Sequence, residues 1–187
     1  MHNNFPNNFY FINSFNKNNI DNLENNTGVI YRSYKKNINL KDVIETKNYC
    51  FQRKIKFYLS NNFKLALKLN LNGAYIPSFN KNFNHLNYSL KKSFIILGSA
   101  HNIKEIRHKE RQNVRLIFIS SLFKKNKNYL GIYKFMNLKK YSKKKIIALG
   151  GISKENLKKV KLLNCEGFSS ISYFETKKKA PKRGLLL

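Results

Sequence analysis

The side chains best suited to chemistry in this chain are hydroxyl, amide, imidazole and cationic groups that follow short apolar runs. A histidine can move a proton near neutral pH, while hydroxyls, amides and cations can hold an anion through donated hydrogen bonds. We therefore expect a polar rim that suits a negatively charged ligand. The residues concerned are Arg32, Ser60, Asn61, Ser99, His101, Asn102, Ser120, Ser121 and Ser172.

The carboxylates lie elsewhere in the chain. Asp and Glu number nine, none directly follows the second to seventh apolar run, and only Glu175 lies shortly past the last one. A two-carboxylate glycosidase and an Asp/Glu-held Mg²⁺ both need carboxylates at such positions. The sequence therefore argues against both, and we predict no metal ligand among the protein's own side chains.

Eight short apolar runs alternate with stretches long enough for helices. Because the runs are almost continuously apolar, they are typical of parallel strands buried on both faces. We predict an α/β fold, a small (β/α)₈ TIM barrel with eight parallel strands; an open doubly wound sheet is the alternative. The chain has 187 residues against about 250 in a usual barrel, so some helices must be short or missing, after strands one, four and six. The runs are 9–12, 28–31, 54–59, 74–76, 94–97, 114–119, 145–149 and 168–171.

The barrel is expected to span residues 9–174. We expect residues 1–8 to be disordered and residues 175–187 to form a basic C-terminal tail. Helices are expected between the strands, one of them starting after an Asn39 cap and another after a Ser153 cap. The expected helices are 40–52, 63–69, 103–111, 132–141 and 154–163.

The composition fits a folded domain with a large positive charge. Apolar residues make up 42% of the chain, which excludes a wholly disordered protein, and the formal net charge is +28. Asn and Lys number 29 and 31, a bias typical of AT-rich codons, so the charge is a weak argument for a polyanionic partner. The lysines of the tail lack the interleaved aromatic residues of a stacking platform. A nucleic-acid partner is therefore not expected.

Two isolated cysteines and the absence of long apolar segments point to the cytoplasm. Cys50 and Cys165 have no CxxC spacing, which is typical of reduced thiols rather than of a disulfide or a metal site. The N-terminus has no cationic segment followed by an apolar one, and no run approaches the roughly 20 apolar residues of a membrane span. We expect a cytoplasmic protein with no membrane partner.

The most informative segment is Ala148-Leu149-Gly150-Gly151-Ile152. A Gly-Gly turn after a strand lets backbone N–H groups approach an anion closely, and the loops after strands seven and eight form the common phosphate site of barrels. Ile171 and Ser172 follow the eighth strand, so the two loops together predict a phosphate site. The alternative is that the two glycines only make a tight turn.

The order of motifs over residues 9–174 resembles that of thiamine-phosphate synthases and their TenI relatives. The segment at residues 148–152 resembles the family's Ala-Ile-Gly-Gly-Ile, and residues 167–172 resemble Gly-Val-Ala-Val-Val-Ser. Gly98-Ser99-Ala100-His101 is similar to Gly-Val-Ser-x-His. The remaining similar segments are Ser60-Asn61 with Leu65-Ala66-Leu67 and Gly73-Ala74-Tyr75-Ile76, then Ser120-Ser121-Leu122-Phe123, and Leu130-Gly131 with Phe135.

The resemblance implies a (β/α)₈ barrel of thiamine biosynthesis. Such a synthase joins hydroxymethylpyrimidine diphosphate to a thiazole phosphate and releases diphosphate, assisted by Mg²⁺. By residue type and position, we predict His101 and Arg32 as the catalytic residues, a general acid/base and a diphosphate clamp. The alternatives are a solvated histidine in a loop and a surface cation. The predicted binding set for phosphorylated small molecules is Arg32, Asn61, Ser99, Gly150, Gly151, Ile171 and Ser172.

The resemblance breaks down at the metal ligands. The family's metal-binding Asp after strand three corresponds to Asn61, and its acidic residue after strand four falls near Phe79 and Asn80. Any Mg²⁺ would then be carried by the diphosphate substrate, and turnover stays open. A TenI-like thiazole tautomerase, a non-catalytic binder of phosphorylated ligands, a nucleic-acid binder and a homo-oligomer remain alternatives.

Overall fold

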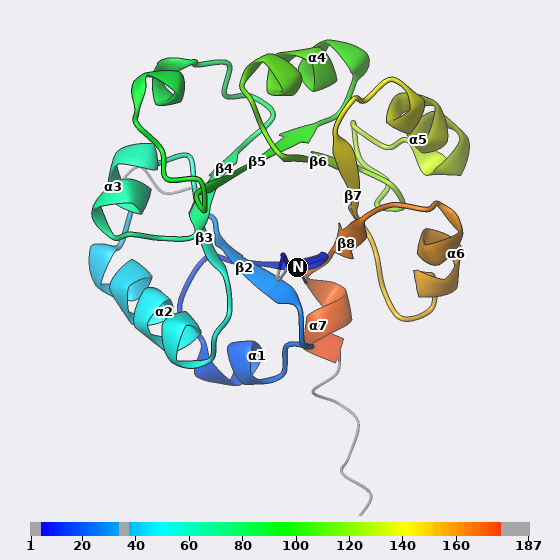
Figure 1. Cartoon of the computed structure of the whole chain (residues 1–187). Helices are drawn as coiled ribbons and strands as arrows, with labels where there is room; N and C mark the ends of the chain where they lie inside the picture. The colour runs from blue at the N-terminus through cyan, green and yellow to red at the C-terminus, as the bar shows by residue number, and fades with distance from the viewer. Residues whose placement is uncertain (1–4, 34–37, 177–187) are drawn as a thin grey trace, which may run out of the picture.

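Eight parallel strands close into a barrel in the computed structural model, which describes residues 5–33 and 38–176. The strands follow one another around the ring in chain order, and β8 returns to β1 (Figure 1). This arrangement confirms the (β/α)₈ barrel over the open sheet. The strands are β1 (Asn8–Ile12), β2 (Thr27–Tyr31), β3 (Phe57–Ser60), β4 (Gly73–Ile76), β5 (Ile95–Ala100), β6 (Leu116–Ile119), β7 (Lys145–Leu149) and β8 (Gly167–Ser169).

Helices cover the outside of the ring (Figure 1). The helix after β1 has five residues, and β4 is followed by a single 3₁₀ turn, η1 (Asn84–Asn87), so the short connections predicted there are confirmed. After β6 the helix has ten residues, so the short connection expected there was wrong, whereas the helix expected at 132–141 is confirmed to within one residue at each end. The helices are α1 (Lys17–Asp21), α2 (Leu40–Gln52), α3 (Phe63–Lys68), α4 (Ile103–Arg111), α5 (Gly131–Lys140), α6 (Leu157–Leu162) and α7 (Ser172–Thr176).

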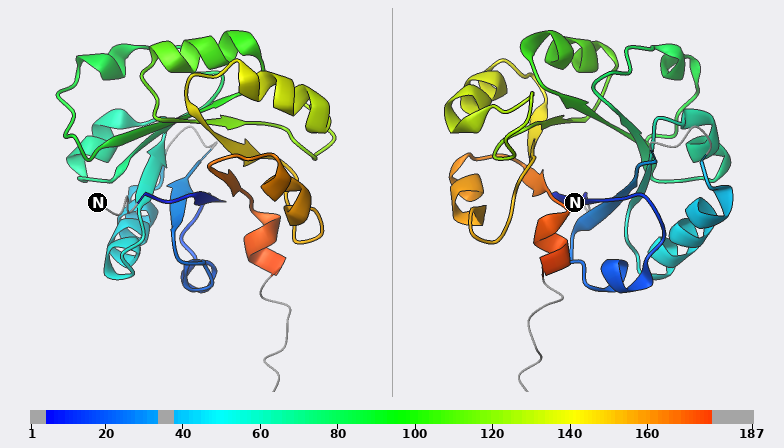
Figure 2. Two further views of the ribbon diagram at one scale, coloured as in Figure 1. Left: turned by 45° about the vertical axis from the view of Figure 1, so that its right-hand side comes forward. Right: turned by 180° about the vertical axis from the view of Figure 1, so that it is seen from behind.

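The last two helices differ from the expectation. Helix α6 begins at Leu157 rather than at residue 154, because Asn156 accepts a hydrogen bond from Ser153 N at 3.0 Å and donates one to Gly151 O at 2.8 Å. Its side chain thus folds the preceding loop instead of capping a helix that starts earlier. Helix α7 was not predicted, and it occupies the outer position between α6 and α1 (Figure 2).

The interior of the barrel is filled by aromatic rings. Side chains alternate between the two faces of a strand, and every second residue therefore points inward. The ring centroid of Phe118 lies 5.0 Å from that of Phe9 and 5.5 Å from that of Tyr75, and both pairs are edge to face. The ring centroids of Phe11 and Tyr75 lie 5.2 Å apart. Such edge-to-face pairs are favourable beyond the area that they bury. A solid interior leaves the rims as the places for a ligand.

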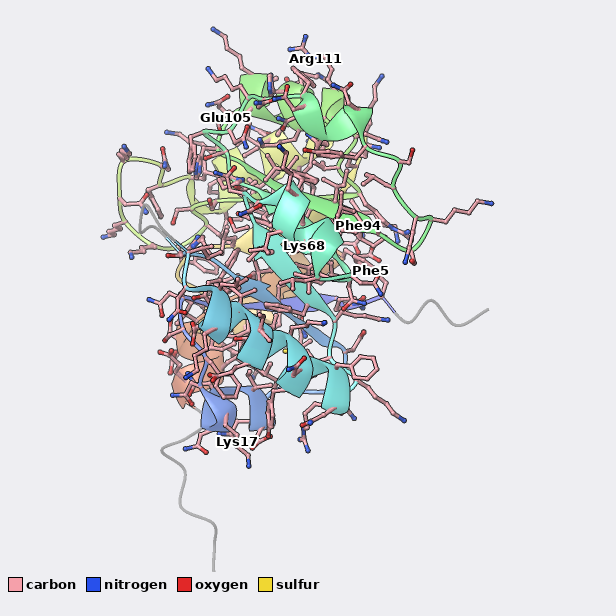
Figure 3. The ribbon with its side chains drawn as sticks, turned by 90° about the vertical axis from the view of Figure 1, so that its left-hand side faces the viewer. Phe5, Lys17, Lys68, Phe94, Glu105 and Arg111 are labelled. Atoms are coloured by element: carbon pink, nitrogen blue, oxygen red, sulfur yellow. The ribbon has the colours of Figure 1, made fainter. Side chains whose placement is uncertain are left out.

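Residues 5–8 close the end of the barrel where the strands begin. The ring of Phe5 lies 6.2 Å from Phe9, the Arg115 guanidinium lies 5.1 Å from the Phe5 centroid, and Pro6 is buried. Figure 3 shows Phe5 at the opposite end of the barrel from Glu105. The structure therefore differs from the expected disorder of residues 1–8 at residues 5–8. Residues 1–4 and most of the expected tail, 177–187, lie outside the described part.

Candidate functional site

The rim at the carboxyl ends of the strands carries hydroxyl and cationic groups on the inward face. Residues two positions after an inward residue also face inward. Leu97 and Phe118 point into the interior of the barrel. Ser99 and Ser120 therefore also face inward, two residues closer to the carboxyl ends of their strands, and both are buried. By the same alternation Arg32 lies above Ile30. The mouth of the barrel therefore offers hydrogen-bond donors and positive charge.

A cavity of about 190 Å³ opens at this rim beside β1, β2 and α7. Arg32 and Ile171 both line it, so the structure brings these two predicted residues together. The Arg32 guanidinium lies 4.4 Å from the centroid of Phe11, a cation–π contact that orients it. The lining does not include the other predicted residues, Asn61, Ser99, His101, Gly150, Gly151 and Ser172.

Glu175 also lines the cavity, and sequence reasoning gave it no role. The Tyr10 hydroxyl donates to Glu175 Oε1 at 3.1 Å and accepts from Asn19 Nδ2 at 2.9 Å. Burial, and secondarily the Glu175 carboxylate, raise the pKa of Tyr10 well above its usual value. The hydroxyl therefore stays protonated, and the cavity is lined by the Glu175 carboxylate as well as by the Arg32 guanidinium. The position of Glu175 shortly past β8 was the available signal.

His101 is held at the end of β5 by both its backbone and its ring. Its N–H donates to Glu105 Oε2 at 2.7 Å, and ring atom Nδ1 lies 2.7 Å from Ser120 O and 3.1 Å from Ser120 Oγ. Because a carbonyl oxygen only accepts, we assign the ring proton to Nδ1. In the neutral ring Nε2 is then the basic nitrogen, as a proton acceptor requires.

The two glycines after β7 are needed for close packing against the loop after β6. Gly150 and Gly151 have φ of +106° and +72°, in the left-handed region. A Cβ at Gly150 would lie 2.6 Å from Ser121 Oγ, and one at Gly151 would lie 2.5 Å from Lys124 N. Phe123 N donates to Gly150 O at 2.8 Å. Loop packing thus explains both glycines, and whether they also hold phosphate stays a prediction.

Ser170, which sequence reasoning did not select, joins the loop after β7 to α7. Its hydroxyl donates to Ile152 O at 2.5 Å and accepts from Tyr173 N at 3.1 Å. Ser172 is exposed and is the first residue of α7, and Ile171 is 42% exposed. The two predicted phosphate loops are therefore fixed to each other through one buried hydroxyl.

We expect Ser170→Ala to destabilise the fold by about 1–3 kcal/mol, because it leaves a buried carbonyl and an N–H without their partner. Urea denaturation measures this change. Ser14→Ala is a suitable control, since the Ser14 hydroxyl is exposed and bonds only to its neighbour Asn13 among the described residues. Equal stability of the two variants would contradict the assignment.

The rim between β3 and β4 carries a pair of amides where the resemblance places metal-binding carboxylates. Asn61 has φ of +60°, and its Oδ1 accepts a hydrogen bond from Asn80 Nδ2. Asn80 Oδ1 accepts from Asn82 N at 2.8 Å. Across residues 5–33 and 38–176, no three His, Cys, Asp or Glu side chains gather to hold a metal ion. Mg²⁺ prefers oxygen ligands with charge, so two engaged neutral amides do not fit a protein-held ion.

Behind Asn80 lies a buried polar pair on α4 and the residue that follows it. Lys109 and Gln112 are fully buried. Lys109 Nζ donates to Asn80 O and to Gln112 Oε1, both at 2.8 Å. Gln112 Nε2 donates to Asn82 O at 2.7 Å. The pair thus fixes the loop after β4, where most barrels have a full helix.

Burial lowers the pKa of Lys109 to about 8. Between that pH and the usual lysine value, the unfolded chain binds a proton that the folded chain has released, so stability must rise with pH. Between about pH 7.5 and about pH 9.5, we expect the free energy of unfolding of wild type to rise by about 2 kcal/mol relative to that of Lys109→Met. Urea denaturation at both pH values measures this gain. A difference between the two proteins that does not change with pH would contradict it.

The closed parallel barrel, with hydroxyl and cationic groups at the carboxyl ends of its strands, defines an α/β-barrel protein. The family model described as thiamine monophosphate synthase matches residues 24–174. Because this match covers most of the chain, the protein belongs to the thiamine monophosphate synthase family. The resemblance inferred from the six motifs is therefore confirmed.

Individual relatives agree with this family. Thiamine-phosphate synthase of Clostridium acetobutylicum is 27% identical over 143 residues, which span 74% of this chain and 65% of that protein. Thiamine phosphate pyrophosphorylase of Pyrococcus furiosus superposes with a TM-score of 0.72 at 15% identity, over 90% of this chain and 86% of that one. FabK from Thermotoga maritima superposes with a TM-score of 0.67 at 9% identity, over 91% of this chain and 59% of that one. At identities of 15% and 9%, these two superpositions show the barrel fold alone.

None of the helices in the described ranges is both long and apolar enough to cross a membrane.

Proposed function

We propose that this protein is a transferase of thiamine biosynthesis that joins hydroxymethylpyrimidine diphosphate to a thiazole phosphate. In this reaction the bond between the pyrimidine methylene carbon and the diphosphate oxygen breaks. The thiazole nitrogen then bonds to that carbon, giving thiamine phosphate and free diphosphate. The observation that carries the proposal is the pair of loops after β7 and β8, joined through Ser170 in a chain of this family.

Each predicted residue has a role in this proposal. Gly150, Gly151 and Ser172 hold the phosphate of the thiazole, since Gly151 N–H and Ile152 N–H donate to no other described residue. Arg32 binds the diphosphate from the cavity, where the stacking on Phe11 supports its orientation. Asn61 and Ser99 contribute neutral hydrogen bonds at the same rim.

His101 offers an unprotonated ring nitrogen, Nε2, as a proton acceptor, although the transfer step written above moves no proton. The hydrogen bond from Nδ1 to Ser120 O supports this role, because it leaves Nε2 unprotonated in the neutral ring. The same geometry favours a second candidate function, tautomerisation of the thiazole phosphate, in which a base moves a proton on a single substrate.

A protein-held metal has no part in the proposed mechanism. The Asn61–Asn80 pair does not fit such an ion, and Mg²⁺ enters only as a companion of the diphosphate substrate. The same pair favours a third candidate, a barrel that binds phosphorylated ligands without turnover. The free thiols of Cys50 and Cys165 support a cytoplasmic placement.

One assay separates these candidates. The purified chain is incubated with both synthase substrates, with and without Mg²⁺, and thiamine phosphate is quantified. The thiazole phosphate is also incubated alone, and its isomer is followed. We expect thiamine phosphate to form. Isomer formation without thiamine phosphate would instead establish the tautomerase, and binding without either product would establish the non-catalytic protein.

A further inference from the structure

Lys109 places a positive charge inside the protein, directly behind the rim. Its side chain is fully buried and crosses Gly98 of β5, where an added Cβ would lie 3.0 Å from Lys109 Cδ. A glycine at this strand position therefore leaves room for the lysine stem. Lysine is almost never fully buried unless it is paired, so its presence here calls for a physical explanation.

No carboxylate forms an ion pair with this ammonium within the described part of the chain. Its hydrogen bonds go to two neutral oxygens, Asn80 O and Gln112 Oε1. Glu105, one turn earlier on α4, raises the pKa of Lys109, yet its oxygens accept from His101 N and Asn102 Nδ2. The charge is therefore solvated by the protein but not cancelled by direct contact.

The charge reaches the rim through Asn80. The Asn80 carbonyl accepts from Lys109, while its side-chain amide donates to Asn61. The electrostatic field of a buried charge is screened less over several ångströms than the field of a charge on a surface lysine. A divalent cation at the two amides would be repelled, whereas an anion would be attracted.

We propose that Lys109 makes the rim between β3 and β4 a subsite for an anionic diphosphate group, bound there without a metal ion held by the protein. This inference rests on the proposed function, in which diphosphate is both a substrate group and a product. Lys109 is a positioning residue in it: the ammonium acts through Asn80 and does not touch the ligand.

Calorimetry with inorganic diphosphate in EDTA at low salt tests the proposal. The main variant is Lys109→Met/Gln112→Leu, which replaces both buried polar groups by apolar ones of similar size. Lys104→Met is the matched control, because it removes one exposed positive charge from the same helix. Binding of a thiazole phosphate at the loops after β7 and β8 reports whether each variant retains its fold.

We expect wild type to bind diphosphate in EDTA, the double variant to bind it at least fivefold more weakly, and Lys104→Met to differ by less than twofold. Binding that requires Mg²⁺, or equal losses in the two variants, would overturn the proposal. Should the double variant fail to fold, Asn61→Asp leaves the core intact and adds a negative charge to the subsite. It should also weaken diphosphate binding at least fivefold, and an unchanged affinity would overturn the proposal.

Failure of this subsite proposal can be distinguished from failure of the proposed synthase function, because the binding measurement needs no turnover. Diphosphate binding that depends on Lys109, in a protein that forms no thiamine phosphate, would retain the subsite and reject the synthase. Synthase turnover with diphosphate binding that is indifferent to Lys109 would retain the function and reject the subsite.

Discussion

Replacing Gly151 by Asp should weaken binding of a thiazole phosphate by at least about a hundredfold, which corresponds to about 2.7 kcal/mol. The new carboxylate repels the phosphate. The side chain also needs space that is absent, since a Cβ there would lie 2.5 Å from Lys124 N, and the φ of +72° disfavours any side chain. The steric conflict should therefore also displace the loop after β6.

Titration calorimetry with a thiazole phosphate measures this loss of affinity. Two further variants, measured in the same way, separate the effect of the charge from that of the steric conflict. Gly151→Ala keeps the steric conflict without the charge. Gly131→Ala places a methyl group at a similar φ of +64°, where the nearest atom is the movable Tyr129 hydroxyl at 3.3 Å. We expect Gly131→Ala to bind within twofold of wild type. If Gly151→Asp also binds like wild type, the loops after β7 and β8 are not the phosphate site.

Replacing Arg32 by Met should lower kcat/KM of the proposed synthase at least about a hundredfold, a loss of about 2.7 kcal/mol. The guanidinium lines the cavity and stacks on Phe11, so it can offer two parallel hydrogen bonds to a phosphate oxygen pair. Methionine keeps the packing on the ring but has neither charge nor donors. Steady-state kinetics with the pyrimidine diphosphate varied measure the effect.

Arg32→Lys and Arg53→Met serve as comparisons. Lysine restores the charge without the planar fork, so we expect an intermediate rate. Arg53 follows α2 and pairs with Asp21 at 3.5 Å on the exposed surface, so its loss changes the net charge equally and should leave kcat/KM unchanged. A rate of Arg32→Met close to that of Arg53→Met would remove Arg32 from the site.

The barrel itself could be predicted because its strands carry their own signal. Runs such as Gly28-Val29-Ile30-Tyr31 are continuously apolar, and eight of them in a chain of this length leave few parallel arrangements. The exact helix boundaries could not be predicted, since hydrogen bonds beyond the local pattern decide them. Asn156 is an example, because its amide turns inward to the loop at Gly151 instead of opening α6.

The candidate site could be predicted only in outline. Position at a strand end identified Arg32 and Ile171, which share the cavity. The same signal was available for Glu175, but position alone does not show that its carboxylate lines the cavity. Ser170 and Lys109 escaped notice for a different reason. One of many serines and one of 31 lysines become informative only when burial shows which of them is solvated by protein instead of water.

The seam between the first and last strands has a consequence for how the molecule is made. Strands β1 and β8 pair at one register position, Phe9 with Ser169, supported by the Ser169 hydroxyl on Phe9 O at 2.8 Å. These partners are 160 residues apart in the sequence, so β1 leaves the ribosome long before β8 has been synthesised. Contacts of such separation form late, because the entropy of closing the intervening chain must be overcome first. The loop that Ser170 fixes lies beside this seam, so the candidate site at the ends of β7 and β8 can form only after both of these strands have left the ribosome.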